Sequence, residues 1–104
     1  MANVTVIVTY PRKDGATFNK EYYLSTHMEL CQKYWKNHGL KSWSVAELAE
    51  GPHSIASIIT FENYEAFGAA MADPNTKLIQ DDVPNFSSEP SSLWHGAVLG
   101  QGTA

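Results

Sequence analysis

The sequence predicts an α+β fold with the order βαββαβ, the ferredoxin-like arrangement of a four-stranded antiparallel sheet with helices on one face. Residues 4–10 alternate with the period of two that is typical of a strand. Residues 20–37 and 64–72 carry apolar side chains at helical spacing. The chain has 104 residues, so we expect residues 1–104 to form a single domain.

The first strand and helix have clear boundary signals. The strand begins near Asn3 and should end at Pro11, because proline cannot donate a backbone hydrogen bond. Asn19 is the predicted N-cap of a helix that runs to about Asn37. Gly39 follows, as expected for the left-handed residue that ends a helix.

The middle of the chain predicts a hairpin and a short helix. Residues 40–48 and 54–61 have strand-like composition, and Gly51-Pro52 marks the turn between them. Asn63 is the predicted N-cap of the helix at 64–72.

The last third predicts a further helical segment and a closing strand. Asp73-Pro74 is typical of an N-cap followed by proline at the first helical position, so residues 74–82 should be helical. That segment should stop at Val83, which precedes a proline. Residues 91–99 form the predicted last strand, with Leu93 and His95 on one face and Trp94 on the other.

Charge and composition exclude several classes of partner. The formal net charge is −4 and the basic residues are scattered, which disfavours nucleic acids and anionic membrane surfaces. The apolar run near the N-terminus is short and lacks a basic leader, so we expect a cytoplasmic protein. Cys31 is the single cysteine and rules out an intrachain disulfide.

One face of the predicted sheet lacks a cover. The first and third strands, 4–10 and 54–61, are largely apolar on both faces, and two helices can cover only one of them. A second copy of the same sheet is the simplest cover, so we expect a homodimer with the two sheets packed face to face.

His27 lies inside the apolar arc of the first helix. At 100° per residue, the arc also holds Tyr23, Leu24 and Cys31, whereas Ser25 and Thr26 lie on the polar side. The ring should therefore point at the sheet. It is either a core histidine with satisfied hydrogen bonds or, since its pKa lies near neutrality, a general acid–base group in a cavity.

The same helix also carries side chains that could ligate a metal. His27 and Cys31 have the i, i+4 spacing of a zinc or copper half-site. His38 is eleven residues from His27, about 16 Å along the axis, too far to share one ion. We expect no metal and no other cofactor, and no glycine-rich nucleotide loop is present in the sequence.

Several short motifs resemble one family. They are TFNKEYYLSTHMEL (17–30), TYP (9–11), FENYEAF (61–67) and DVPNFSSEP (82–90). In this order they resemble the EthD family, named for ethyl tert-butyl ether degradation, within the dimeric α+β barrel superfamily. The resemblance runs over residues 4–99. The family usually has proline two residues after the helix histidine, where this chain has Glu29.

The resemblance implies both a fold and a class of activity. It implies the ferredoxin-like fold and the homodimer of a dimeric α+β barrel. Related members act without cofactors on polyketide-type or aromatic molecules as cyclases, dehydratases or decarboxylases. By position, His27 matches the helix histidine and Asp82 the acidic residue that opens DVPNF. Asp82 could hold the tautomer of His27, or it could only cap the turn before Pro84.

Other side chains are candidates for a substrate cavity. Tyr23 lies near His27 on the helical wheel and could donate a hydrogen bond to a developing enolate oxygen. Further residues could line an aromatic cavity or could be ordinary core or interface residues. These are Tyr10, Tyr22, Cys31, Tyr34, Trp35, Trp43, Phe86 and Trp94.

The sequence thus favours a cofactor-independent enzyme that acts on a small, hydrophobic, aromatic or polyketide-type carbonyl compound. His27, Asp82 and Tyr23 are its predicted catalytic residues. A cofactor-free oxygenase, and with less support a haem-binding oxygenase, are alternatives within the superfamily. A non-catalytic carrier of a hydrophobic small molecule and a purely structural dimer are alternatives of other classes.

Overall fold

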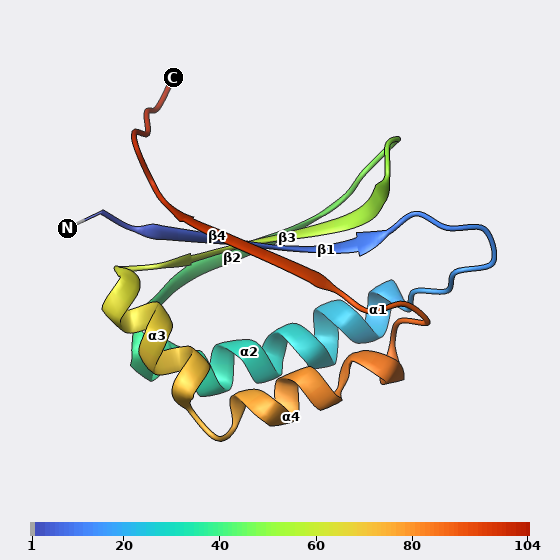
Figure 1. Cartoon of the computed structure of the whole chain (residues 1–104), viewed down its shortest axis with the longest axis horizontal. Coiled ribbons are helices and arrows are strands. Elements are labelled where there is room, and N and C mark those ends of the chain that lie inside the picture. Colours follow the sequence, from blue (N-terminus) through green and yellow to red (C-terminus); the bar gives the residue numbers. More distant parts are fainter. Residues whose placement is uncertain (1) are drawn as a thin grey trace.

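The computed structural model describes residues 2–104, which form one antiparallel sheet with helices on a single face (Figure 1). The strand order is β2-β3-β1-β4. The bounds are Val4–Pro11 for β1, Leu40–Glu47 for β2, His53–Phe61 for β3 and Ser92–Ala97 for β4. This is the ferredoxin-like arrangement, so the predicted fold class is confirmed.

The helices lie together below the sheet in Figure 1. Their bounds are Lys20–Tyr22 for α1, Met28–Trp35 for α2, Tyr64–Ala72 for α3 and Thr76–Asp81 for α4. A π-helical turn, Tyr23–His27, joins α1 to α2 without a break. Short 3₁₀ turns, Lys36–His38 and Val83–Asn85, follow α2 and α4.

The predicted caps are confirmed in their contacts. The Asn19 side chain accepts a hydrogen bond from the Tyr22 amide at 3.0 Å, and the Asn63 side chain accepts one from the Ala66 amide at 2.8 Å. Gly39 has φ of 80°, the left-handed conformation that lets the chain turn out of the helix into β2.

Some predicted boundaries were wrong by a few residues. β1 ends at Pro11 as expected, and its register with β3 shifts there. β4 is shorter than residues 91–99. The helix expected from Pro74 begins at Thr76, because the Asp73 side chain accepts a hydrogen bond from the Asn75 amide at 2.8 Å and folds this segment into a turn first.

Strand register decides which side chains of β4 meet the helices. Val8 pairs with Leu93 and Ile7 pairs with Trp94. Val8 faces the helices, so Leu93 does as well. Trp94 lies on the opposite face, where its indole N–H donates to the Thr9 hydroxyl at 3.3 Å.

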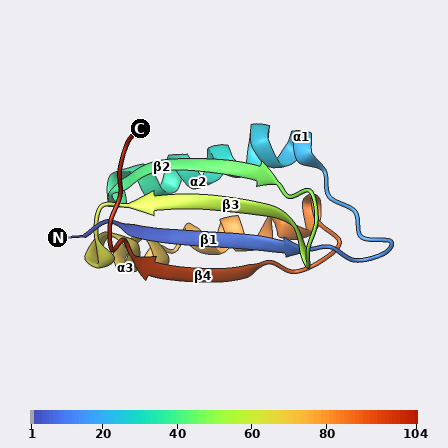
Figure 2. The same ribbon diagram turned by 90° about the horizontal axis from the view of Figure 1, so that it is seen from above.

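The sheet face opposite the helices carries no charge at its paired positions. Figure 2 views the molecule from this side. The outward positions hold Thr5, Ile7, Thr9, Ser42, Ser44, Ala46, Ala56, Ile58, Thr60, Ser92, Trp94 and Gly96. We call this set the outer sheet face. Solvated sheet faces normally carry charged side chains, so its composition is unusual for a surface left in water.

The core lies between the sheet and the helices. Val4 and Phe61 from the strands and Met28 from α2 are among its most deeply buried side chains. Because α2 and α4 both lie against this layer, residues 27 and 82 come together from distant parts of the sequence. Within residues 2–104, no helix has the length and apolar character needed to cross a membrane.

Candidate functional site

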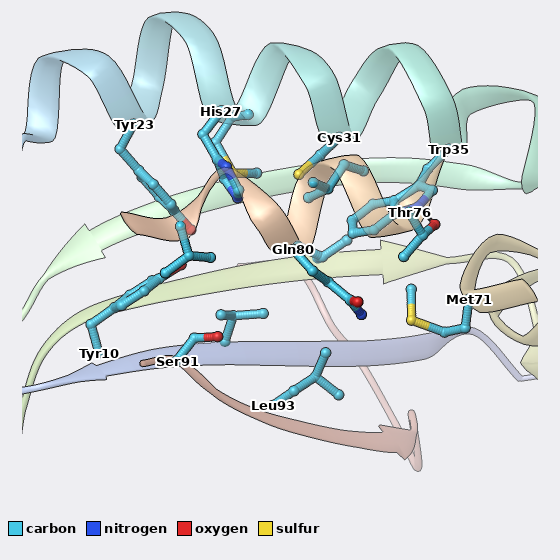
Figure 3. Close-up of a pocket in the computed structure, with 15 residues that line it drawn as sticks. Tyr10, Tyr23, His27, Cys31, Trp35, Met71, Thr76, Gln80, Ser91 and Leu93 are labelled. Atoms are coloured by element: carbon cyan, nitrogen blue, oxygen red, sulfur yellow. Dashed lines mark hydrogen bonds between the residues drawn. The ribbon is translucent and has the colours of Figure 1, made fainter. Parts of the chain in front are cut away.

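A cavity of about 140 Å³ lies between the sheet and the helices (Figure 3). Side chains from β1, β3, β4, the π-helical turn, α2, α3 and α4 line it. His27 is one of these side chains. Gln80, Ser91 and Leu93 are the exposed members of the lining, so the cavity opens between α4 and β4.

The π-helical turn carries two of the side chains that reach the cavity. Its wide turn is closed by the Met28 amide, which donates to the Tyr23 carbonyl five residues earlier. Tyr23, His27 and Met28 are all buried, as on a uniform α-helical wheel, whereas Leu24 is 48% exposed. A uniform α-helical wheel places Leu24 in the apolar arc, so that expectation was wrong. Such π-helical turns often occur at functional sites.

Asp82 and two aromatic rings hold His27 in place. The imidazole is 5% exposed, and its Nδ1 lies 2.9 Å from Oδ2 of Asp82. The ring stacks on Tyr23 with centroids 5.2 Å apart and tilts against Phe86 at 4.5 Å. These contacts leave one ring orientation, in which Nδ1 is bonded and Nε2 is free for another partner.

The Asp82 carboxylate is the most heavily hydrogen-bonded group of the site. Its Oδ1 accepts from the Tyr22 hydroxyl at 2.7 Å and from the Asn85 side-chain amide at 2.9 Å, and Oδ2 faces His27. Burial alone would raise the pKa of this carboxyl. The hydrogen bonds from Asn85, Tyr22 and His27 outweigh that effect and hold its pKa below the ordinary value. Asp82 is therefore an anion at neutral pH.

An anionic Asp82 fixes the tautomer of His27. Because a carboxylate can only accept, Nδ1 must carry the proton and donate it to Asp82. Burial lowers the pKa of His27, although Asp82 opposes this shift. The ring is thus neutral near pH 7 with a bare lone pair on Nε2. Within residues 2–104, no group donates a hydrogen bond to that nitrogen. The arrangement is suited to a general base.

Neutral donors lie beside the imidazole. The Tyr23 hydroxyl is hydrogen-bonded to the Ser57 hydroxyl. Burial raises the pKa of Tyr23 to about 12, and burial together with the neighbouring Tyr23 raises that of Tyr10 still further. Burial also raises the pKa of the Cys31 thiol to about 12. These groups stay protonated at neutral pH, so they can donate hydrogen bonds but do not carry charge.

The structure brings five of the eleven predicted site residues to the cavity. Tyr10, Tyr23, His27, Cys31 and Trp35 line it (Figure 3). Tyr22 and Phe86 lie behind the lining, where Tyr22 donates to Asp82 and Phe86 packs on the imidazole. Asp82 stands in the same layer and reaches the cavity only through His27.

Three predicted lining residues lie elsewhere. Trp94 belongs to the outer sheet face because of its register with β1. Trp43 lies on edge strand β2, and its indole N–H donates to Gln32 on the outside of α2 at 3.0 Å. Tyr34 packs against the margin of the core, near the Lys33 ammonium. Each was a reasonable candidate by residue type, but none lines this cavity.

Several lining residues were missed by the sequence analysis. Met71, Thr76 and Gln80 come from α3 and α4, and Ser91 precedes β4. The sequence places these residues on elements but does not show how those elements lie over the sheet. The alternation of Leu93 with Trp94 was the one available signal, but it did not show which of the two faces the helices, and the register with β1 selects Leu93.

Metal-ligating side chains do not gather in the described part of the chain. Residues 2–104 hold no group of three or more His, Cys, Asp or Glu side chains that could bind an ion. His38, weighed as a ligand with His27, bonds instead to Asp73 at 2.8 Å beyond the end of α2.

Three comparisons place the chain among known proteins. No protein-family profile matches it. No curated protein matches its sequence. Solved structures do match. An EthD-like protein from Ralstonia eutropha JMP134 is 23% identical, with 99% of this chain and 97% of that chain covered and a TM-score of 0.85.

More distant matches share the same fold. SnoaB, a cofactor-independent oxygenase from Streptomyces nogalater, is 14% identical over 98% of this chain and 97% of its own, with a TM-score of 0.65. A dimeric ferredoxin-like protein of unknown function from Thermobifida fusca is 13% identical over 93% and 92%, with a TM-score of 0.64. The chain therefore has the fold of EthD-like proteins, as its motifs predicted.

The His27–Asp82 pair should make stability depend on pH. The pKa of His27 in the folded protein is below its ordinary 6.5, so between those values the unfolded chain binds more protons. The contribution of the neutral His27 ring to the free energy of unfolding is therefore complete above pH 6.5. It decreases as the pH falls below 6.5. Asp82 acts in the same direction below its ordinary pKa of 3.8.

Urea unfolding should show a lower free energy of unfolding at pH 5 than at pH 7.5. The fall should be smaller in His27→Gln, and an equal fall in both proteins contradicts this assignment.

Proposed function

We propose that this chain is a homodimeric member of the EthD family and a cofactor-independent enzyme. Its substrate is a small, hydrophobic, aromatic or polyketide-type carbonyl compound. His27 is the general acid–base group, Asp82 orients it, and Tyr23 stabilises charge on the substrate oxygen. The reaction is a cyclisation, dehydration or decarboxylation.

One observation carries this proposal. A neutral imidazole, fixed through Nδ1 by a buried carboxylate, borders a mainly apolar cavity that holds no charged side chain. Nε2 is not a fully buried atom, so it faces the cavity, where it can accept a hydrogen bond from a ligand or from water. No described group bonds to Nε2. A ligand atom in the cavity would satisfy it.

The proposed chemistry follows from the protonation states. Nε2 of His27 removes a proton from carbon adjacent to the substrate carbonyl, and the electron pair moves to the carbonyl oxygen as an enolate. The proton on Nε2 makes an imidazolium, which the Asp82 anion stabilises at 2.9 Å. The Tyr23 hydroxyl can donate to the enolate oxygen. The imidazolium then returns the proton to carbon or to a leaving oxygen.

Two other functions have support of their own. The fold match with SnoaB favours a cofactor-free oxygenase, in which the same base would form the substrate anion. The apolar lining and the opening between α4 and β4 would also suit a carrier of a hydrophobic molecule. Proton exchange at carbon separates the carrier from the enzymes, because only a base in the cavity accelerates it. A cytoplasmic location stays a prediction.

The homodimer is proposed from the outer sheet face. Its paired positions carry no charge, and Ile7, Ile58 and Trp94 give it an apolar centre. Exposed apolar patches of this kind mark interaction sites. Two such faces are self-complementary when related by a two-fold axis. One protein with this fold is itself described as dimeric.

Exchange with solvent deuterium tests the catalytic roles. Acetophenone, a neutral aromatic ketone, should exchange its methyl protons faster with the wild-type protein than in buffer, as followed by NMR. His27→Gln should return the rate to that of buffer. Asp82→Asn should lower the rate about 10²- to 10⁴-fold, since its amide can donate to Nδ1 and move the ring proton to Nε2.

A second histidine–aspartate pair supplies the matched control. His38 and Asp73 have the same chemistry at 2.8 Å but lie outside the cavity. His38→Gln and Asp73→Asn should therefore leave the exchange rate within about twofold of wild type. If His27→Gln binds acetophenone and exchanges it at the wild-type rate, the catalytic proposal is wrong. Binding with no wild-type acceleration supports the carrier.

Sedimentation tests the dimer. The chain mass is 11.5 kDa, so a species of about twice that mass should dominate at micromolar concentration. Ile58→Asp puts a charge in the outer sheet face and should give monomers. Leu24→Asp, on an exposed site of the helical layer, should leave the mass unchanged. A wild-type mass near 11.5 kDa contradicts the homodimer.

A further inference from the structure

We infer that the cavity takes a neutral substrate with a single ring, whose oxygen-bearing end lies at His27, Tyr10 and Tyr23 and whose apolar end lies toward Trp35 and Met71. This inference rests on the proposed function, because it assigns the substrate class of the same cavity. It excludes the fused polycyclic skeletons that the broader proposal still allows, and also decarboxylation, because the substrate of a decarboxylase carries a carboxylate.

Size is the first argument. The cavity measures about 140 Å³. An apolar cavity of about 150 Å³ holds benzene. A second fused ring would have to displace a lining side chain or extend through the opening between α4 and β4, where it would lose contact with the lining. Interiors are packed to nearly crystalline density, so such a movement is costly except at the exposed rim. Leu93, which is 47% exposed, lies on that rim.

Charge is the second argument. The lining contains no Asp, Glu, Lys or Arg side chain. Its titratable members are neutral at pH 7, because burial raises the pKa of Tyr23 and Cys31 and lowers that of His27. The nearby anion, Asp82, is already satisfied by Tyr22, Asn85 and His27. A carboxylate or phosphate on the substrate would be buried without a counter-ion, which is strongly unfavourable.

Polarity is divided between the two ends of the cavity, and this division orients the ring. Figure 3 shows Tyr10, Tyr23 and Ser91 together at one end and Trp35 and Met71 at the other. The first end offers hydroxyl groups near the imidazole. A carbonyl or phenolic oxygen would therefore lie at that end.

The other end holds two polar side chains, Thr76 and the exposed Gln80, whose amide reaches in from the rim (Figure 3). The Thr76 hydroxyl donates to the Ala70 carbonyl at 2.6 Å and accepts from the Trp35 indole at 2.9 Å. Both of its hydrogen-bonding roles are used within the protein. The apolar edge of a ring is the part of a substrate that suits this end.

Aromatic ketones of graded size test the inference. Full-length protein with ¹³C-labelled methionine methyl groups would be titrated with acetophenone, 2-acetylnaphthalene and 9-acetylanthracene, which share a ketone and differ in ring number. Met28 and Met71 line the cavity and report occupancy through their methyl shifts. Acetophenone should shift both signals. The two-ring ketone should bind at least about tenfold more weakly, and the three-ring ketone should give no shift. Benzoate, a charged single ring, should give no shift either.

A variant at the rim keeps the test independent of folding. Leu93→Ala removes bulk from the rim and should tighten 2-acetylnaphthalene binding about tenfold. Leu24→Ala removes the same bulk from an exposed site of the helical layer. It should change neither the affinity for acetophenone nor that for 2-acetylnaphthalene. Equal changes in both variants would contradict the size limit.

The outcomes separate this inference from the proposed function. If the two- or three-ring ketone binds as tightly as acetophenone, or if benzoate binds equally well, the single-ring neutral class is wrong. His27-dependent proton exchange of the larger ketone would then still support the enzyme. If acetophenone alone binds but no ketone undergoes His27-dependent exchange, the size class stands and the enzyme fails. Failure of every ketone to bind overturns the inference.

Discussion

The hydrogen bond between His27 and Asp82 is the interaction on which the site depends. It joins residues 55 positions apart, and both side chains are buried. Removal of either partner leaves a buried polar group unsatisfied, so the bond ties the chemistry to the stability of the helical layer. The same bond sets the tautomer of the ring. One contact thus supplies both the position of the base and its protonation state.

Two local structures make that contact possible. The π-helical turn at Tyr23–His27 carries His27 and Tyr23, both of which lie buried against the sheet. The C-terminus of α4 places Asp82 directly before a 3₁₀ turn, whose Asn85 side chain then holds the carboxylate. The cost of the irregular helical turn is offset by burial of two aromatic rings and the imidazole. The proposed site and the local irregularity of the helix coincide here, as functional sites and π-helical turns often do.

The predictable parts of this protein are those governed by short-range signals. Strand alternation and the asparagine caps gave the element order, and the inward direction of His27 followed from its helix. Tertiary geometry decided which of the other side chains reach the cavity. No local pattern signals the π-helical turn that exposes Leu24. Trp43 and Trp94 were chosen by residue type, but an edge strand and the strand register place them away from the cavity. Gln80 was missed because only the packing of α4 over the sheet brings it to the cavity.

The central claim is that His27 rests as a neutral ring with its proton on Nδ1. Two-dimensional ¹H–¹⁵N NMR of the histidine side chains at pH 7.5 tests it directly, with His27→Gln used to assign the signals. The account predicts a protonated, hydrogen-bonded Nδ1 and the shift of an unprotonated nitrogen at Nε2. A proton on Nε2, or a ring charged at this pH, would contradict it.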